Sequence, residues 1–122
     1  MIGLIQRVTE ARVEVASEGV AAIDRGLLVL IGVQQGDDDR RAERLLERLL
    51  GYRVFPDAMG RMNLNLVEVG GGLLLVPQFT LAADTRKGTR ARFTRAAPPE
   101  EGRRLFELLR EKARARYSPV ES

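Results

Sequence analysis

Arginine, carboxylate and hydroxyl side chains are the groups through which this chain could perform chemistry, because its 122 residues include no histidine and no cysteine. Disulfides, thiol nucleophiles and Ser-His or Cys-His pairs are therefore excluded, and zinc and haem sites lose their usual ligands. An enzyme of this composition would work through those side chains, through backbone groups or through functional groups of its substrate. We expect it to use no metal and no cofactor.

Basic side chains gather toward the end of the chain. Residues 84–122 carry 11 basic and 6 acidic side chains, whereas residues 1–83 carry 9 and 11. Of the 20 cations, 18 are arginine, which pairs well with phosphate oxygens. Arg86, Lys87 and Arg90 lie in a segment without clear periodicity, which predicts a basic loop. Two interpretations stay open: a surface that contacts a polyanion, and ordinary solvated side chains.

A single mixed α/β domain over residues 1–122 is predicted to position these groups. Apolar residues at helical spacing predict a helix that begins at Asp37–Asp39 and ends at a left-handed cap on Gly51. A second helix begins at Pro98 and ends before Pro119. Alternating or unbroken apolar runs predict about five short strands and one extended segment, at residues 2–8, 12–15, 27–33, 52–55, 63–66 and 73–76.

Neither a membrane span nor an export signal is predicted. No apolar run approaches the ~20 residues needed to cross a bilayer, and Met1–Arg7 lacks the basic and apolar regions of a signal peptide. We therefore expect a cytoplasmic protein that does not enter a membrane.

Four stretches of sequence form a pattern when they are taken together. They are Ile5–Val8, the segment from Tyr52 through Pro56-Asp57 to Leu64, Gln78–Leu81 with Ala83–Gly88, and Ala96–Pro99. Their order and spacing resemble the D-aminoacyl-tRNA deacylase (D-tyrosyl-tRNA deacylase) family. The resemblance implies a closed, barrel-like mixed sheet with two main helices, in a homodimer with active sites along the subunit interface. It also implies hydrolysis of the ester that joins a D-amino acid, or glycine, to the terminal adenosine of tRNA.

The resemblance implies site residues as well. Gln78, Phe79 and Thr80 match three critical positions of the family's catalytic motif, and the backbone N–H groups around Phe79 and Thr80 would hold the carbonyl or amino end of the substrate. A ribose hydroxyl of the tRNA would assist the attack, so this chemistry rests on proximity and preorganised electrostatics. Arg7 would brace the element that checks chirality, and Met62 would help to bind the substrate. Without the resemblance, Phe79 reads as a core residue, Gln78 and Thr80 as a strand end, and Arg7 as a surface arginine.

Two departures from the family pattern affect what we expect. Pro77 stands in the substrate-binding motif where the family has serine, which removes a hydroxyl and a backbone donor. The sequence also contains no Gly-Pro dipeptide, although family members end in strands with a Gly-cisPro element that rejects L-amino acids. We therefore expect a domain that is truncated at its C-terminal end relative to the family and has an exposed sheet edge. Its dimer should be less stable than that of a full-length homologue, or should repair this edge through another subunit. The alternatives are an inactive homologue that retains tRNA binding or dimerisation, and a structural partner module.

Overall fold

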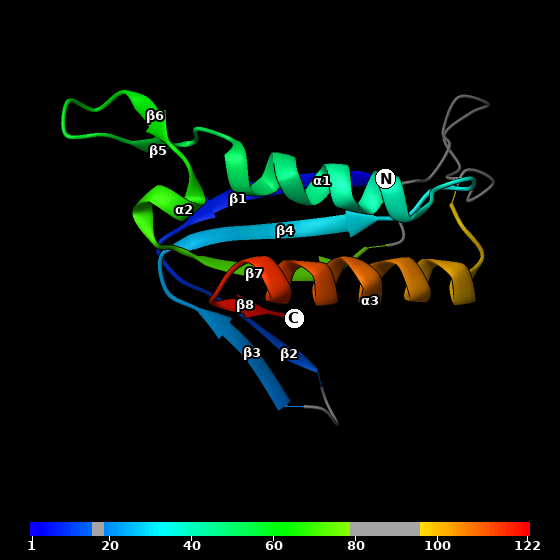
Figure 1. The fold of residues 1–122 in the computed structure, drawn as a ribbon. Coiled ribbons are helices and arrows are strands. Elements are labelled where there is room, and N and C mark those ends of the chain that lie inside the picture. Colours follow the sequence, from blue (N-terminus) through cyan, green and yellow to red (C-terminus); the bar gives the residue numbers. More distant parts are fainter. Residues whose placement is uncertain (16–18, 79–95) are drawn as a thin grey trace, which may run out of the picture.

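A computed structural model describes residues 1–15, 19–78 and 96–122 and shows a mixed α/β fold (Figure 1). The strands and helices follow one another as β1 (Ile2–Val8), β2 (Ala11–Val15), β3 (Gly19–Ile23), β4 (Gly26–Gly32), α1 (Asp39–Gly51), β5 (Phe55–Pro56), β6 (Met62–Leu64), α2 (Leu66–Val69), β7 (Gly72–Pro77), α3 (Pro99–Arg116) and β8 (Val120–Glu121). The prediction of one mixed sheet-and-helix fold with two main helices is confirmed. No helix in these described ranges is both long and apolar enough to cross a membrane.

The main sheet has four strands in the order β1-β4-β7-β8. β1 pairs with β4 in antiparallel fashion, while β4 with β7 and β7 with β8 are parallel pairs. Strands β2 and β3 form a separate hairpin, as do β5 and β6. Within the described residues these three sheets share no ladder of hydrogen bonds, so the predicted closed barrel is not observed there.

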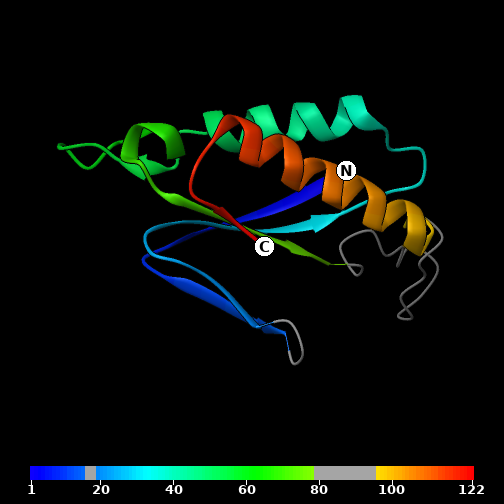
Figure 2. The ribbon, with the colours of Figure 1, turned by 60° about the horizontal axis from the view of Figure 1, so that its bottom comes forward.

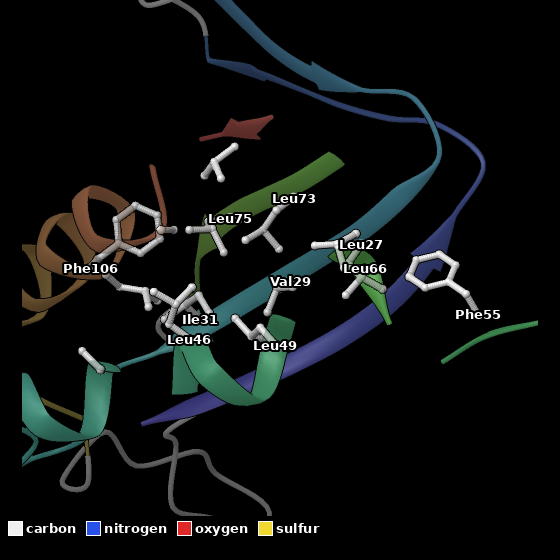
Figure 3. Close-up of a cluster of buried hydrophobic side chains, with 14 residues drawn as sticks. Leu27, Val29, Ile31, Leu46, Leu49, Phe55, Leu66, Leu73, Leu75 and Phe106 are labelled. Atoms are coloured by element: carbon white, nitrogen blue, oxygen red, sulfur yellow. The ribbon is translucent and has the colours of Figure 1, made fainter. Parts of the chain in front are cut away.

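Both long helices cover one face of the main sheet (Figure 2). Leu27, Val29 and Ile31 alternate along β4 and belong to the buried cluster that α1 and α3 complete (Figure 3). Leu28 and Leu30, at the intervening positions, are half-buried. One face of this strand is therefore buried in the core, whereas the other face is only partly covered by the described residues.

β4 and β7 start side by side at an unusually close approach of two glycines. A Cβ atom added to Gly26 would lie 1.9 Å from the carbonyl oxygen of Gly72. No side chain fits at that distance, so the parallel pairing of the two central strands requires glycine at position 26.

The first helix begins as the sequence predicted but ends differently. Asp38 is its N-cap, and the carboxylate accepts a hydrogen bond from the backbone N–H of Arg41 at 2.9 Å. At the other end, Gly51 is the last helical residue and has no positive φ, because Tyr52 caps the helix in an extended conformation. The predicted left-handed cap on Gly51 is therefore wrong.

The two helices are joined by charged side chains as well as by apolar packing. Glu43 of α1 accepts a hydrogen bond from Lys112 of α3 at 3.0 Å and lies 3.5 Å from Arg116. The hydrogen bond from Lys112, with the positive charge of that side chain, lowers the pKa of Glu43. Because the pair is partly exposed, it orients the helices more than it stabilises the fold.

Candidate functional site

Arg7 and Met62, both proposed to serve the substrate, meet in the structure although 55 residues separate them. Arg7 lies on the edge strand β1, and its Nη1 atom donates to the carbonyl oxygen of Val54 at 2.7 Å and to the sulfur of Met62 at 3.0 Å. Both side chains are exposed. The contacts therefore give a solvent-accessible guanidinium a defined position at the base of the β5–β6 hairpin.

Asp57 shapes the hairpin that carries Met62. Its Oδ1 atom accepts from the backbone N–H groups of Met59 at 2.8 Å and Arg61 at 3.0 Å, while Oδ2 accepts from Nδ2 of Asn63 at 3.0 Å. The hydrogen bond from the Arg61 backbone, followed by that from Asn63, holds the pKa of Asp57 below its ordinary value of 3.8. This carboxylate thus closes the turn in its ionised form.

The lowered pKa of Asp57 makes a prediction about acid stability. A carboxylate with a lower pKa in the folded state stabilises the fold above its unfolded pKa, and this contribution is lost as the pH falls through the folded value. The melting temperature of the wild type should therefore exceed that of Asp57→Asn by more at about pH 6 than at about pH 3. Melting curves of both proteins at the two pH values measure the gap; a gap that does not shrink in acid would contradict the role given to this carboxylate.

Pro77 and Gln78 lie at the end of β7. Pro77 pairs with Ile31 as the last residue of β7, so the strand extends one residue beyond the end predicted at residue 76. The ladder continues past it because the backbone N–H of Gln78 donates to the carbonyl oxygen of Ile31 at 2.8 Å. Proline fits here because backbone N–H groups alternate in direction along a strand. Since Gln78 donates toward β4, the donor that Pro77 lacks would point away from β4.

A cavity of about 480 Å³ opens beside this strand end. Pro77 and Gln78 form one wall, and Arg103, Glu107 and Arg110 of α3 line the other. Nε of Arg110 is buried and has no hydrogen-bond partner among the described residues. The cavity therefore combines an apolar floor with a largely cationic wall beside the motif that the sequence singled out.

Arg7 and Met62 lie at one end of the main sheet, and Pro77 and Gln78 lie at the other end. Arg7 pairs with Leu27, whereas Pro77 pairs with Ile31, four residues farther along β4. At ~3.3 Å per residue this places the groups about 13 Å apart along the strands, with β4 between them. One chain does not bring Arg7 into contact with Pro77 or Gln78.

Several predicted site residues lie outside the described ranges, namely Phe79, Thr80, Arg86, Lys87 and Arg90.

Three other residues near the candidate sites were not selected by the sequence analysis: Asp57, Arg103 and Arg110. The role of Asp57 in the turn could have been predicted from Pro56-Asp57 and Gly60, because an aspartate at the start of a turn accepts hydrogen bonds from the backbone that follows it. No sequence signal distinguished the two helix arginines from their solvated neighbours. Within the described part of the chain, no three acidic, histidine or cysteine side chains gather as a metal site would require.

Comparison with known proteins gives one consistent result. The family model described as D-Tyr-tRNA(Tyr) deacylase matches residues 4–122. The chain is 65% identical to the D-aminoacyl-tRNA deacylase of Alkalilimnicola ehrlichii over 122 residues, which is 100% of this chain and 81% of that relative. It is 62% identical to the enzyme of the same name from Nitrosococcus oceani over 118 residues, covering 97% and 76% of the two chains.

Two solved structures share the fold of this chain. A structure described as a c-Myc DNA Unwinding Element Binding Protein superposes with a TM-score of 0.89 at 32% identity, covering 97% of this chain and 80% of that one. A structure described as a probable eukaryotic D-amino acid tRNA deacylase shares the fold with a TM-score of 0.77 at 17% identity, covering 93% and 66%. On the family match and the sequence identities, the chain belongs to the D-Tyr-tRNA(Tyr) deacylase family.

Proposed function

We propose that this chain is a hydrolase that cleaves the ester bond of D-aminoacyl-tRNA. Water adds to the ester carbonyl, the bond from the acyl carbon to the ribose oxygen breaks, and that oxygen leaves with a proton as free tRNA. The products are the D-amino acid and a tRNA that can be charged again, so the activity proofreads translation. The single observation that carries the proposal is the family match over residues 4–122, with 65% identity to a D-aminoacyl-tRNA deacylase.

The proposed catalytic segment is Gln78, Phe79 and Thr80. The backbone N–H of Gln78 is already bonded to Ile31, so it is not free to bind a substrate oxygen. We therefore assign the role of backbone donor to Phe79 and Thr80, and leave to Gln78 a contact through its half-buried side chain. A chain without histidine or cysteine is compatible with such a site, because fixed backbone dipoles and the ribose hydroxyl replace a side-chain nucleophile.

The remaining assignments concern substrate and partner. Arg7, Met62 and Pro77 would bind the aminoacyl end, and the basic residues Arg86, Lys87 and Arg90 would meet tRNA phosphates, which makes binding sensitive to salt. Strand β4 and about 13 Å along the strands separate Arg7 from Pro77. This separation supports a homodimer, since a second copy can add its residues to a site that one chain leaves divided. Light scattering of the purified protein should then give about twice the chain mass. Such a substrate supports a cytoplasmic location.

Deacylation of three purified substrates tests the proposal. Incubation with D-tyrosyl-tRNA, glycyl-tRNA on tRNA-Ala and L-tyrosyl-tRNA should release the amino acid from the first two and leave the third intact. Release from D-tyrosyl-tRNA alone would show that glycyl-tRNA is not a substrate, while still supporting a D-aminoacyl-tRNA deacylase. No release from any of them, together with salt-sensitive retention of tRNA on the protein, would instead support an inactive tRNA-binding homologue.

A further inference from the structure

We propose that Asp57 is a positioning residue that sets the stereochemical selectivity of the enzyme by holding Met62 against Arg7. The proposal rests on the assignment of Arg7 to the substrate-binding residues under the proposed function. It begins from the contacts of Arg7, both of which come from one segment: the carbonyl of Val54 and the sulfur of Met62. The position of the segment that carries Val54 and Met62 therefore determines the direction of the Arg7 guanidinium.

The strand pairing of this segment is too short to fix its shape. β5 and β6 pair only at Phe55 with Leu64 and at Pro56 with Met62, and the register shifts between the two pairs. An isolated two-stranded hairpin is marginally stable even when it is longer. Other bonds must therefore keep Met62 in place.

The carboxylate of Asp57 supplies those bonds. It accepts three hydrogen bonds from Met59, Arg61 and Asn63, so its two oxygens reach residues on both sides of Met62. The backbone of Asp57 adds two more, donating its N–H to the Arg61 carbonyl at 2.8 Å and accepting from Gly60 at 3.0 Å. Bonds to an ionised acceptor are stronger than neutral ones, which makes the carboxylate the main tie across the turn.

The base of the hairpin is anchored separately. Phe55 is fully buried, and the guanidinium of Arg25 lies 5.3 Å from the centre of its ring. Removing the Asp57 carboxylate should therefore free the turn and Met62 while leaving Val54 and Phe55 in place. Arg7 would keep one of its two contacts and lose the other, which changes its direction without unfolding the domain.

A double-mutant cycle tests whether Asp57 affects selectivity through Arg7 or through a general change in the structure. Asp57→Ala should lower the ratio of kcat/KM for D-tyrosyl-tRNA over L-tyrosyl-tRNA by about tenfold, and Asp57→Asn, which keeps one acceptor oxygen, by less. In an Arg7→Ala background, Asp57→Ala should change the ratio by less than about twofold. The matched control is Asp24→Ala, an exposed aspartate in the turn before β4 with no hydrogen bond of its side chain among the described residues. An equal effect of Asp57→Ala in both backgrounds would overturn the proposal.

A second readout does not depend on activity. The chain has three methionines, so labelling their methyl groups with ¹³C gives three NMR signals, for Met1, Met59 and Met62. Asp57→Ala and Arg7→Ala should each shift the Met62 signal and leave the Met1 signal unchanged. A Met62 signal that neither variant moves would refute the positioning role. If the wild type shows no deacylation, the proposed function fails while this measurement still decides the role of Asp57.

Discussion

Asp37→Asn is expected to lower the free energy of unfolding by about 1.5–3 kcal/mol, because it removes a buried carboxylate that accepts charge-assisted hydrogen bonds from the Met1 amino group and the Gln34 backbone. The amino group of Met1 lies 2.8 Å from Oδ1 of Asp37, whose side chain is 0% exposed. Nη1 of Arg41 lies 3.3 Å from the same oxygen. Oδ2 of Asp37 accepts from the backbone N–H of Gln34 at 2.7 Å. The carboxylate thus ties the start of β1 to the turn that leads into α1.

Chemical denaturation of the wild type and the variant measures this effect, provided that both give the same slope against denaturant. Asp39→Asn is the matched control two residues away. Its carboxylate is 64% exposed and lies 3.3 Å from Arg104, so its loss should cost no more than about 1 kcal/mol. Similar losses at positions 37 and 39 would contradict the burial of the Asp37 carboxylate.

Gly26→Ala should have an effect at least as large, and we expect it to prevent folding. The added methyl group would overlap the backbone oxygen of Gly72 at 1.9 Å, where no flexible side chain can give way. Forcing β4 and β7 apart at this point disrupts the parallel pair at the centre of the core, at a cost of about 3 kcal/mol or more. Circular dichroism and the yield of folded protein measure the outcome.

Gly51→Ala is the control for that substitution. Nothing lies within 4 Å of a Cβ added there, and the residue is helical with no positive φ. The free energy of unfolding should stay constant or rise by up to about 1 kcal/mol, because alanine favours a helix more than glycine does. A folded Gly26→Ala protein with wild-type stability would show that the two central strands are not as close as described.

Periodicity was sufficient to predict the elements that form the core. β4 is an unbroken apolar run between glycines, and α1 follows three aspartates with apolar residues at helical spacing; both appear close to their predicted ends. β3 was missed because Ile23 is its single buried residue, which leaves too weak a pattern. The extended segment expected at 63–66 divides into β6 and the start of α2.

The start of α2 could have been predicted from the sequence. Asn65 caps α2, accepting from the backbone of Glu68, while the Glu68 side chain accepts from the backbone of Asn65. This reciprocal capping box marks a helix start. Sheet closure had no such signal, because it depends on which strand edges meet in space and not on the pattern within any strand.

The candidate site was predicted in part. Arg7, Met62 and Gln78 were selected by their place in family motifs, but their spatial relation was not readable from the sequence. The contact of Arg7 with Met62 depends on a turn that Asp57 closes, and the distance between Arg7 and Pro77 depends on the register of three strands. Contacts between residues far apart in sequence leave no local pattern to read.

The most direct measurement of the central claim compares D-tyrosyl-tRNA with L-tyrosyl-tRNA under identical conditions. The purified chain should hydrolyse the D-form with a kcat/KM at least about tenfold higher than that of the L-form, the minimum expected of an enzyme that discriminates by contacts to its substrate. Equal rates for the two enantiomers, or release of D-tyrosine no faster than in buffer, would contradict the assignment of this chain as a D-aminoacyl-tRNA deacylase.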